Sequence, residues 1–156
     1  MAVQKLKDFL DRNRVEYVSI SHSPAYTAQK VAALAHVKGR NLAKAVMIKV
    51  DGKMAMAVLP AKYRIDLQLL RAETGAREVE LAPETEFENL FPNCDTGAEP
   101  PFGNLWDLPV YVDRTLTQDE EIAFNAGSHS ELLQLSYADY ARLVKPRVIA
   151  FSRPER

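Results

Sequence analysis

The stretch Leu42–Leu59, LAKAVMIKVDGKMAMAVL, decides the fold of this 156-residue chain. Two runs of β-forming residues flank Asp51-Gly52, the dipeptide that a type I′ turn favours, so the stretch predicts a β-hairpin. With a two-residue loop, counting back along both strands pairs Lys44 with Leu59. Because side chains alternate between the two faces of a strand, Lys44 shares its face with Val46, Ile48 and Val50. A lysine therefore heads an otherwise apolar face.

The elements outward from this hairpin follow from apolar spacing, caps and turn formers. Helices are predicted over 3–13, 27–39, 66–75, 83–91 and 136–143, with Pro83 in the first turn of its helix. Strands are predicted over 15–20, 79–81, 110–113, 121–125, 132–135 and 148–151, with a turn over 126–130 and a long loop over 92–104. This pattern predicts one α+β domain, residues 1–156, in which helices surround a mixed, largely antiparallel, barrel-like sheet.

The composition excludes several classes of protein. The apolar fraction of 47% and the charged fraction of 26% are typical of a globular domain. The N-terminus lacks a signal peptide and no apolar run is long enough to span a bilayer, so cytosolic residence is expected. A lone cysteine, Cys94, cannot form an internal disulfide, which suits a reducing compartment.

The side chains that most often carry chemistry are scattered. His22, His36, His129 and Cys94 show no metal-ligand spacing, so no structural zinc is expected. No Walker, dinucleotide-glycine or serine-elbow pattern appears, which disfavours a nucleotide cofactor and a serine triad. Cys94 has two interpretations, a nucleophile paired with a histidine or an inert thiol, and a lone cysteine is more often inert.

Positive charge gathers in one part of a chain whose net charge is −1. Asp and Glu are absent from Tyr17 through Val50, whereas Lys30, Lys38 and Arg40 fall there. Such asymmetry predicts an electropositive face that holds a phosphate backbone weakly. The alternative is that these side chains are merely solvated.

Two turn-rich stretches offer polar groups to a ligand. Gly97–Gly103, GAEPPFG, combines stiffening prolines with glycines that let backbone approach a ligand, and its N–H groups suit an ester carbonyl or an oxyanion. Asn125–His129, NAGSH, places an amide, a hydroxyl and an imidazole at one turn. The structural alternatives are a turn that carries Phe102 into the core and a plain hairpin turn.

Six short stretches, taken in order, resemble the YbaK/prolyl-tRNA synthetase editing-domain family. They are His22–Ala28, Asn41–Val46, Ala57–Pro60, Arg64–Leu67, Gly97–Gly103 and Phe124–Ser128. Their order and spacing are more specific than any one of them, and the resemblance covers nearly the whole chain. It implies a free-standing trans-editing aminoacyl-tRNA deacylase that acts on mischarged tRNA without a metal or cofactor.

The resemblance also implies roles for individual residues. Lys44 matches the family's strand lysine, which engages the tRNA 3′ end and holds the scissile ester. The backbone of Gly97 and Ala98, with Pro100 and Pro101, matches the loop that holds the carbonyl or the terminal ribose. The implied contacts of the aminoacyl end are His22, Tyr26, Thr27, Asn125, Gly127, Ser128 and His129. Lys30, Lys38 and Arg40 are the expected contacts of the tRNA backbone.

The implied reaction asks little of the protein. An aminoacyl ester is already activated, so a site need only place water, stabilise the oxyanion and position the terminal adenosine. The amino acid is expected to be small, with alanine, serine, threonine, cysteine and 2-aminobutyrate all open. A synthetase is a candidate partner, and a monomer is the default. The rival interpretations are a non-catalytic tRNA- or synthetase-binding module of the same fold and a hydrolase of another small ester.

Overall fold

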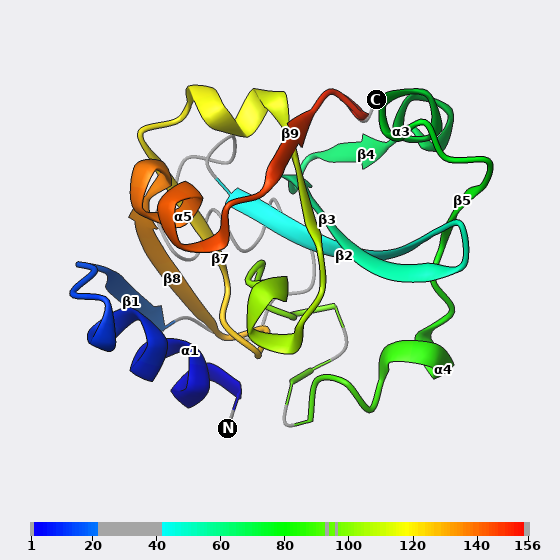
Figure 1. Ribbon diagram of the computed structural model, residues 1–156. Helices are drawn as coiled ribbons and strands as arrows, with labels where there is room; N and C mark the ends of the chain where they lie inside the picture. The colour runs from blue at the N-terminus through cyan, green and yellow to red at the C-terminus, as the bar shows by residue number, and fades with distance from the viewer. Residues whose placement is uncertain (1, 22–41, 93, 96, 155–156) are drawn as a thin grey trace.

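The computed structural model describes residues 2–21, 42–92, 94–95 and 97–154, and Figure 1 shows how their elements are arranged. The helix expected over 27–39 lies outside the described residues. Within those residues, no helix is long and apolar enough to cross a lipid bilayer.

The predicted hairpin is confirmed and forms the middle of the main sheet. β2 spans Leu42–Val50, β3 spans Lys53–Pro60, and their antiparallel register pairs Lys44 with Leu59. Asp51 and Gly52 have φ angles of 49° and 79°. Positive φ at both central residues is what a type I′ turn requires, so the turn chemistry read from the sequence sets the register of the whole hairpin.

The fold class is confirmed as α+β with a mixed sheet. Within the described residues the strand order is β1-β8-β7-β2-β3-β6-β9, with β5 also pairing β2. The β2–β7, β3–β6 and β6–β9 pairs are parallel and the others are antiparallel. The bounds are β1 Val18–Ser21, β5 Val79–Leu81, β6 Val110–Asp113, β7 Glu121–Asn125, β8 Glu131–Ser136 and β9 Arg147–Ile149. A separate two-stranded ribbon pairs β4 (Tyr63–Ile65) with β10 (Ser152–Pro154).

The helices begin and end largely where their caps predict. They are α1 Ala2–Arg12, α3 Leu67–Thr74, α4 Glu84–Phe87 and α5 Tyr137–Val144, with short 3₁₀ turns η2 Gly103–Trp106 and η3 Arg114–Gln118. The Asp66 carboxylate accepts the Leu69 N–H at 3.0 Å at the start of α3. Gly75 ends the same helix with a φ of 73°. The Ser136 hydroxyl accepts the Asp139 N–H at 3.1 Å at the start of α5, so these side-chain caps satisfy backbone donors that a helix leaves open.

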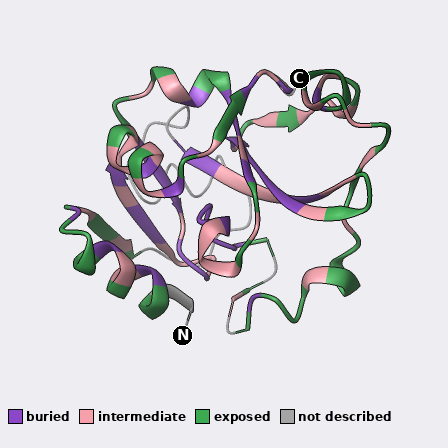
Figure 2. Ribbon diagram, in the orientation of Figure 1, coloured by how far each residue is buried: buried purple, intermediate pink, exposed green. Residues whose placement is uncertain are grey.

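Apolar side chains are buried on both faces of the central hairpin. Figure 2 shows the buried residues of β2 and β3 in purple. On one face, Met47, Met56 and Val58 join the large core that α1 and α5 cover. On the other face, Ile48 and Leu59 pack with α3 and the β4–β10 ribbon in a second core. Lys44 points to this second face, as the alternation predicts, near the start of β2, where a small third cluster adjoins the second core.

Two predicted boundaries, of the strand over 15–20 and of the helix over 83–91, are wrong. The strand predicted over 15–20 begins only at Val18, because the Val15 N–H still bonds to the Leu10 carbonyl at 3.0 Å after α1 and its side chain is buried. The helix predicted over 83–91 ends at Phe87, and Pro83 is its N-cap rather than part of its first turn. Phe91 instead turns into the core before Pro92, where proline disfavours helical backbone.

The end of the strand predicted over 148–151 is also wrong, because β9 ends at Ile149 and a separate strand, β10, begins at Ser152. The buried Asp113 carboxylate causes the division. One of its oxygens accepts the backbone N–H groups of Phe151 at 2.8 Å and Ser152 at 3.0 Å. These donors therefore leave the ladder with β6, and the chain crosses to pair with β4.

Candidate active site

The structure brings together the two turn-rich stretches that the sequence singles out. The Asp95 N–H donates to the Gly127 carbonyl at 2.8 Å, and the Gly127 N–H donates to the Ala98 carbonyl at 2.9 Å. The His129 N–H adds a contact to an Asp95 carboxylate oxygen at 3.3 Å. The loop around Gly97 and the turn over 126–130 therefore form one unit where β7 ends and β8 begins.

Gly97 occupies a backbone conformation that favours glycine. Its φ is 85°, in the left-handed region, where a side chain would be strained. A Cβ atom built on it would lie 3.7 Å from His129 Cε1. The His129 imidazole, whose role the sequence leaves open, therefore lies against the backbone of this loop.

Buried apolar groups hold the loop from below. Pro100 and Pro101 are buried, and Phe102 is 0% exposed. The Phe102 ring centroid lies 5.2 Å from that of Tyr140 and 5.5 Å from that of Phe124. The Tyr140 hydroxyl donates to the Pro101 carbonyl at 2.7 Å. The stretch does carry Phe102 into the core, and this same anchoring fixes the position of the loop.

Lys44 and Asn125 lie side by side across a parallel strand pair. The β2–β7 register pairs Leu42 with Ala123 and Ala43 with Phe124, so the next position places Lys44 beside Asn125. Both side chains are partly buried and share the face of the Leu42 cluster. The Asn125 Oδ1 atom is buried without a hydrogen-bond partner among the described residues. A buried acceptor without a partner calls for an explanation, and a hydrogen bond from a bound ligand would provide one.

The backbone donors of the loop are used within it. The Gly97 N–H donates to Glu99 Oε1 at 3.3 Å, and the Ala98 N–H donates to the Asp95 carbonyl at 3.0 Å. Pro100 and Pro101 have no N–H to offer. In this conformation the N–H groups of Gly97 and Ala98 are therefore already hydrogen bonded.

Glu99 is a site-adjacent residue that the sequence analysis does not single out. Its side chain is 8% exposed in the described structure. Burial raises the pKa of the Glu99 carboxyl, although hydrogen bonds from its own N–H and from Gly97 oppose the rise. The Glu84 carboxylate raises this pKa further, whereas His129 lowers it. In a loop rich in turn formers a glutamate is typically solvated, so no sequence signal predicts its burial.

Replacing Glu99 by glutamine is expected to stabilise the protein at neutral pH. Because the folded-state pKa is raised, the stability that Glu99 contributes is complete below its unfolded pKa of about 4.3 and is lost as pH rises through the folded pKa. Glutamine keeps an oxygen for the Gly97 N–H and cannot ionise. Urea unfolding should give similar free energies for both proteins near pH 4 and a higher value for Glu99→Gln near pH 8. A less stable variant near pH 8 would contradict this assignment.

Cys94 is poorly suited to be a nucleophile. Burial, with Glu99 and Asp95 nearby, raises the pKa of the Cys94 thiol to about 11. The thiolate is the reactive form, so almost none is present at neutral pH. This favours the inert-thiol interpretation. Among the described residues, no group of three or more histidine, cysteine, aspartate or glutamate side chains is placed to hold a metal ion.

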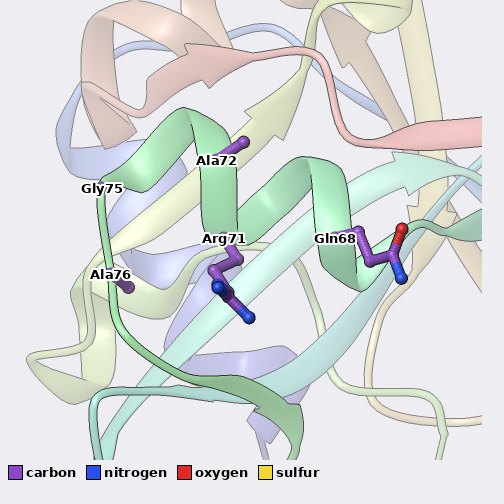
Figure 3. A pocket seen from close by; sticks show the side chains of 5 residues that line it. All are labelled: Gln68, Arg71, Ala72, Gly75 and Ala76. Atoms are coloured by element: carbon purple, nitrogen blue, oxygen red, sulfur yellow. The ribbon is translucent and has the colours of Figure 1, made fainter.

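Neither of two surface hollows lined by described residues contains a predicted site residue. Figure 3 shows one, of about 510 Å³, on the outer side of α3 and lined by Gln68, Arg71, Ala72, Gly75 and Ala76. The Arg71 side chain projects beside the last turn of the helix, where the macrodipole disfavours an anion. The other hollow lies over the ends of β1, β7 and β8 and carries acidic side chains such as Glu16, Glu120 and Glu121.

The predicted site divides between described and undescribed residues. The structure brings together Gly97, Ala98, Gly127 and His129 through direct contacts, and it places Lys44 beside Asn125. Ser128 lies in the same turn, with its hydroxyl 3.3 Å from that of Ser130. His22, Tyr26, Thr27, Lys30, Lys38 and Arg40 lie outside the described residues.

Comparisons with known proteins agree on one family. The family described as the aminoacyl-tRNA editing domain matches residues 22–143. The multifunctional Ser/Thr-tRNA deacylase ProXp-y of Escherichia coli K12 is 31% identical over 158 residues, which cover 96% of this chain and 92% of that protein. The prolyl-tRNA editing protein ProX of Acetoanaerobium sticklandii is 26% identical over 142 residues, which cover 87% and 86%.

A solved structure supports the same fold. It is described as a crystal structure of an enzyme provisionally assigned to trans-editing for prolyl-tRNA synthetase. It superposes with a TM-score of 0.82 at 18% identity and covers 97% of both chains.

Proposed function

Because this chain belongs to the aminoacyl-tRNA editing domain family, we propose that it removes serine or threonine from mischarged tRNA. Its general activity is that of a trans-editing aminoacyl-tRNA deacylase, a hydrolase of the ester between an amino acid and the terminal ribose. Water adds to the carbonyl carbon, the bond to the ribose oxygen breaks, and that oxygen takes a proton. The products are a free amino acid and an uncharged tRNA.

The open acceptor on Asn125 is the observation that carries the choice of amino acid. Serine and threonine differ from alanine and 2-aminobutyrate by a side-chain hydroxyl, which donates one hydrogen bond. The Asn125 Oδ1 atom is buried, lacks a partner among the described residues and lies beside Lys44. A bound hydroxyl would satisfy it, whereas a methyl group would leave it unpaired at a cost of about 1–3 kcal/mol. The name of the Escherichia coli relative, a Ser/Thr-tRNA deacylase, supports the same choice.

Lys44 and the Gly97–Pro101 loop have different proposed roles in stabilising the oxyanion and binding the terminal ribose. Lys44 is a partly buried cation on an apolar face, where its charge stabilises an oxyanion more strongly than it would in bulk water. The Gly97 and Ala98 N–H groups are hydrogen bonded inside the loop. We therefore assign the oxyanion to Lys44 and the terminal ribose to the Gly97–Pro101 loop and to Gly127–His129 of the neighbouring turn. His22, Tyr26 and Thr27 complete this proposal as contacts of the aminoacyl group.

The first experiment is release of labelled amino acid from a panel of mischarged tRNAs, with Asn125→Ala beside the parent. The parent should release serine and threonine faster than alanine or 2-aminobutyrate, by about 10-fold or more from one hydrogen bond. Asn125→Ala should lose that preference while still cleaving the alanyl ester. A parent that prefers alanine would contradict the choice of serine and threonine. Tight tRNA binding without release would favour a non-catalytic module, and equal cleavage of simple esters would favour the small-ester hydrolase.

The working context is also part of the proposal. We propose that residues 1–156 act as one editing domain, because α1 near the start and Phe151 near the end both contribute to cores around the same hairpin. The proposed setting is the cytoplasm, and the proposed partner is the acceptor end of tRNA. Lys30, Lys38 and Arg40 are the proposed contacts of the tRNA phosphate backbone. The protein is proposed to act as a monomer, with an aminoacyl-tRNA synthetase as the candidate protein partner.

A further inference from the structure

A row of exposed cations begins close to Lys44. The Ala61 N–H, just after β3, donates to the Leu42 carbonyl at 2.7 Å, so the turn into β4 is fastened to the start of β2. Lys62 lies in that turn and Arg64 follows in β4, and both are exposed. Arg153 on β10 pairs directly with Arg64. We call Lys62, Arg64 and Arg153 the β4 strip.

The β4–β10 ribbon packs so that Arg64 and Arg153 face solvent. Tyr63 and Ile65 pack against the second core, so alternation turns Arg64 to the opposite, solvent side. Arg153 shares that side because directly paired residues lie on one face of a ribbon, with Cβ atoms about 4.5–5.5 Å apart. Two arginines have therefore been placed next to each other on a solvent face.

The charge of the strip is only partly compensated. Like charges directly opposite each other destabilise a strand pair. Arg153 forms an ion pair with Asp66, which lowers the pKa of the Asp66 carboxyl. Among the described residues, neither Lys62 nor Arg64 makes an ion pair or side-chain hydrogen bond. Three cations against one carboxylate leave a net positive ribbon, and an anion bound across it would relieve the repulsion.

We infer that the β4 strip binds the phosphate backbone of the tRNA acceptor arm while the 3′ end lies at Lys44. The inference rests on the proposed function, because it needs tRNA as the substrate. Guanidinium groups match phosphate oxygens through paired hydrogen bonds, and the strip offers two of them side by side. The position of the strip also fits. Lys62 follows Ala61, whose N–H donates to the carbonyl of Leu42, and Leu42 lies two positions before Lys44 on β2. The stretch Arg64–Leu67, which the proposed chemistry leaves without a role, then has one at its first residue.

The test compares charge-removing variants on opposite sides of the molecule. Lys62→Gln/Arg64→Gln removes two charges from the strip. Arg12→Gln/Arg14→Gln removes two exposed charges at the end of α1, which Figure 1 places far from β4. Binding of uncharged tRNA is measured at several salt concentrations, together with release of amino acid from an aminoacylated adenosine that lacks the tRNA body. Thermal melting checks that each variant is folded.

The expected result is specific to the strip. Its variant should bind tRNA more weakly at low salt, and the slope of log K against log salt should become shallower by about two. The control variant should keep the parent's slope, and both variants should cleave the aminoacylated adenosine at the parent's rate. A folded strip variant with the parent's slope would overturn the inference while leaving the proposed function intact. A parent that releases no amino acid from any charged tRNA would instead overturn the proposed function.

Discussion

Lys44→Ala is expected to reduce deacylation by about 10²–10³-fold and to leave the protein folded. Removing one group that stabilises an oxyanion has an effect of this size in other hydrolases. Lys44 lies near the start of β2, is partly buried and pairs with Leu59. The position of its ammonium group is thus set by the β2–β3 hairpin, whose register the Asp51-Gly52 turn fixes. Single-turnover release of serine from mischarged tRNA measures the effect without interference from product release.

Lys44→Met is the matched control for this prediction. Methionine retains most of the apolar stem that lies along the sheet and lacks the charge. If the ammonium group acts on the ester, Lys44→Met should be as inactive as Lys44→Ala while melting closer to the parent. Activity of Lys44→Met near the parent's would show that only the stem is needed. Unchanged activity in both variants would remove Lys44 from the mechanism.

The sequence predicts those parts of the fold whose signals are local. Asp51-Gly52 sets the hairpin register, and that register alone places Lys44 on its face. Asp66 and Ser136 act as the predicted helix caps. In each case the residues that interact lie a few positions apart, so spacing contains the information.

The parts that the sequence does not predict depend on contacts between distant residues. Asp113 divides the last strand by accepting N–H groups 38 and 39 positions away. The hydrogen bond between Ala98 and Gly127 joins two loops that are 29 positions apart in the chain. Taken alone, each loop can be explained as a plain structural turn, so the sequence does not reveal their contact. Nothing near Glu99 in the chain indicates that its carboxyl is buried. These contacts depend on the order of the strands in the sheet. The sequence predicts only that the sheet is mixed and largely antiparallel.

Phe102→Ala is expected to lower the free energy of unfolding by about 3–5 kcal/mol, the usual cost of removing a buried phenyl ring. Phe102 is 0% exposed and its ring contacts those of Phe9, Phe124 and Tyr140, with centroids 6.3, 5.5 and 5.2 Å away. Urea unfolding measures the loss. Because domains of this size are stable by about 5–15 kcal/mol, the milder Phe102→Leu provides a second point if the alanine variant does not fold.

Tyr140→Phe separates anchoring of the loop from general stability. It keeps the ring and removes only the hydroxyl that donates to the Pro101 carbonyl, for an expected loss of about 1–3 kcal/mol. Both substitutions act on residues beneath the Gly97–Pro101 loop, so deacylation by folded protein should fall in each, and further in Phe102→Ala. If Phe102→Ala loses several kcal/mol but retains full activity, the contacts to Gly127 must hold the loop in place without the aromatic anchor. If Phe102→Ala lowers the free energy of unfolding by less than about 1 kcal/mol, neighbouring side chains must fill the space of the missing ring, which a well-packed interior rarely allows.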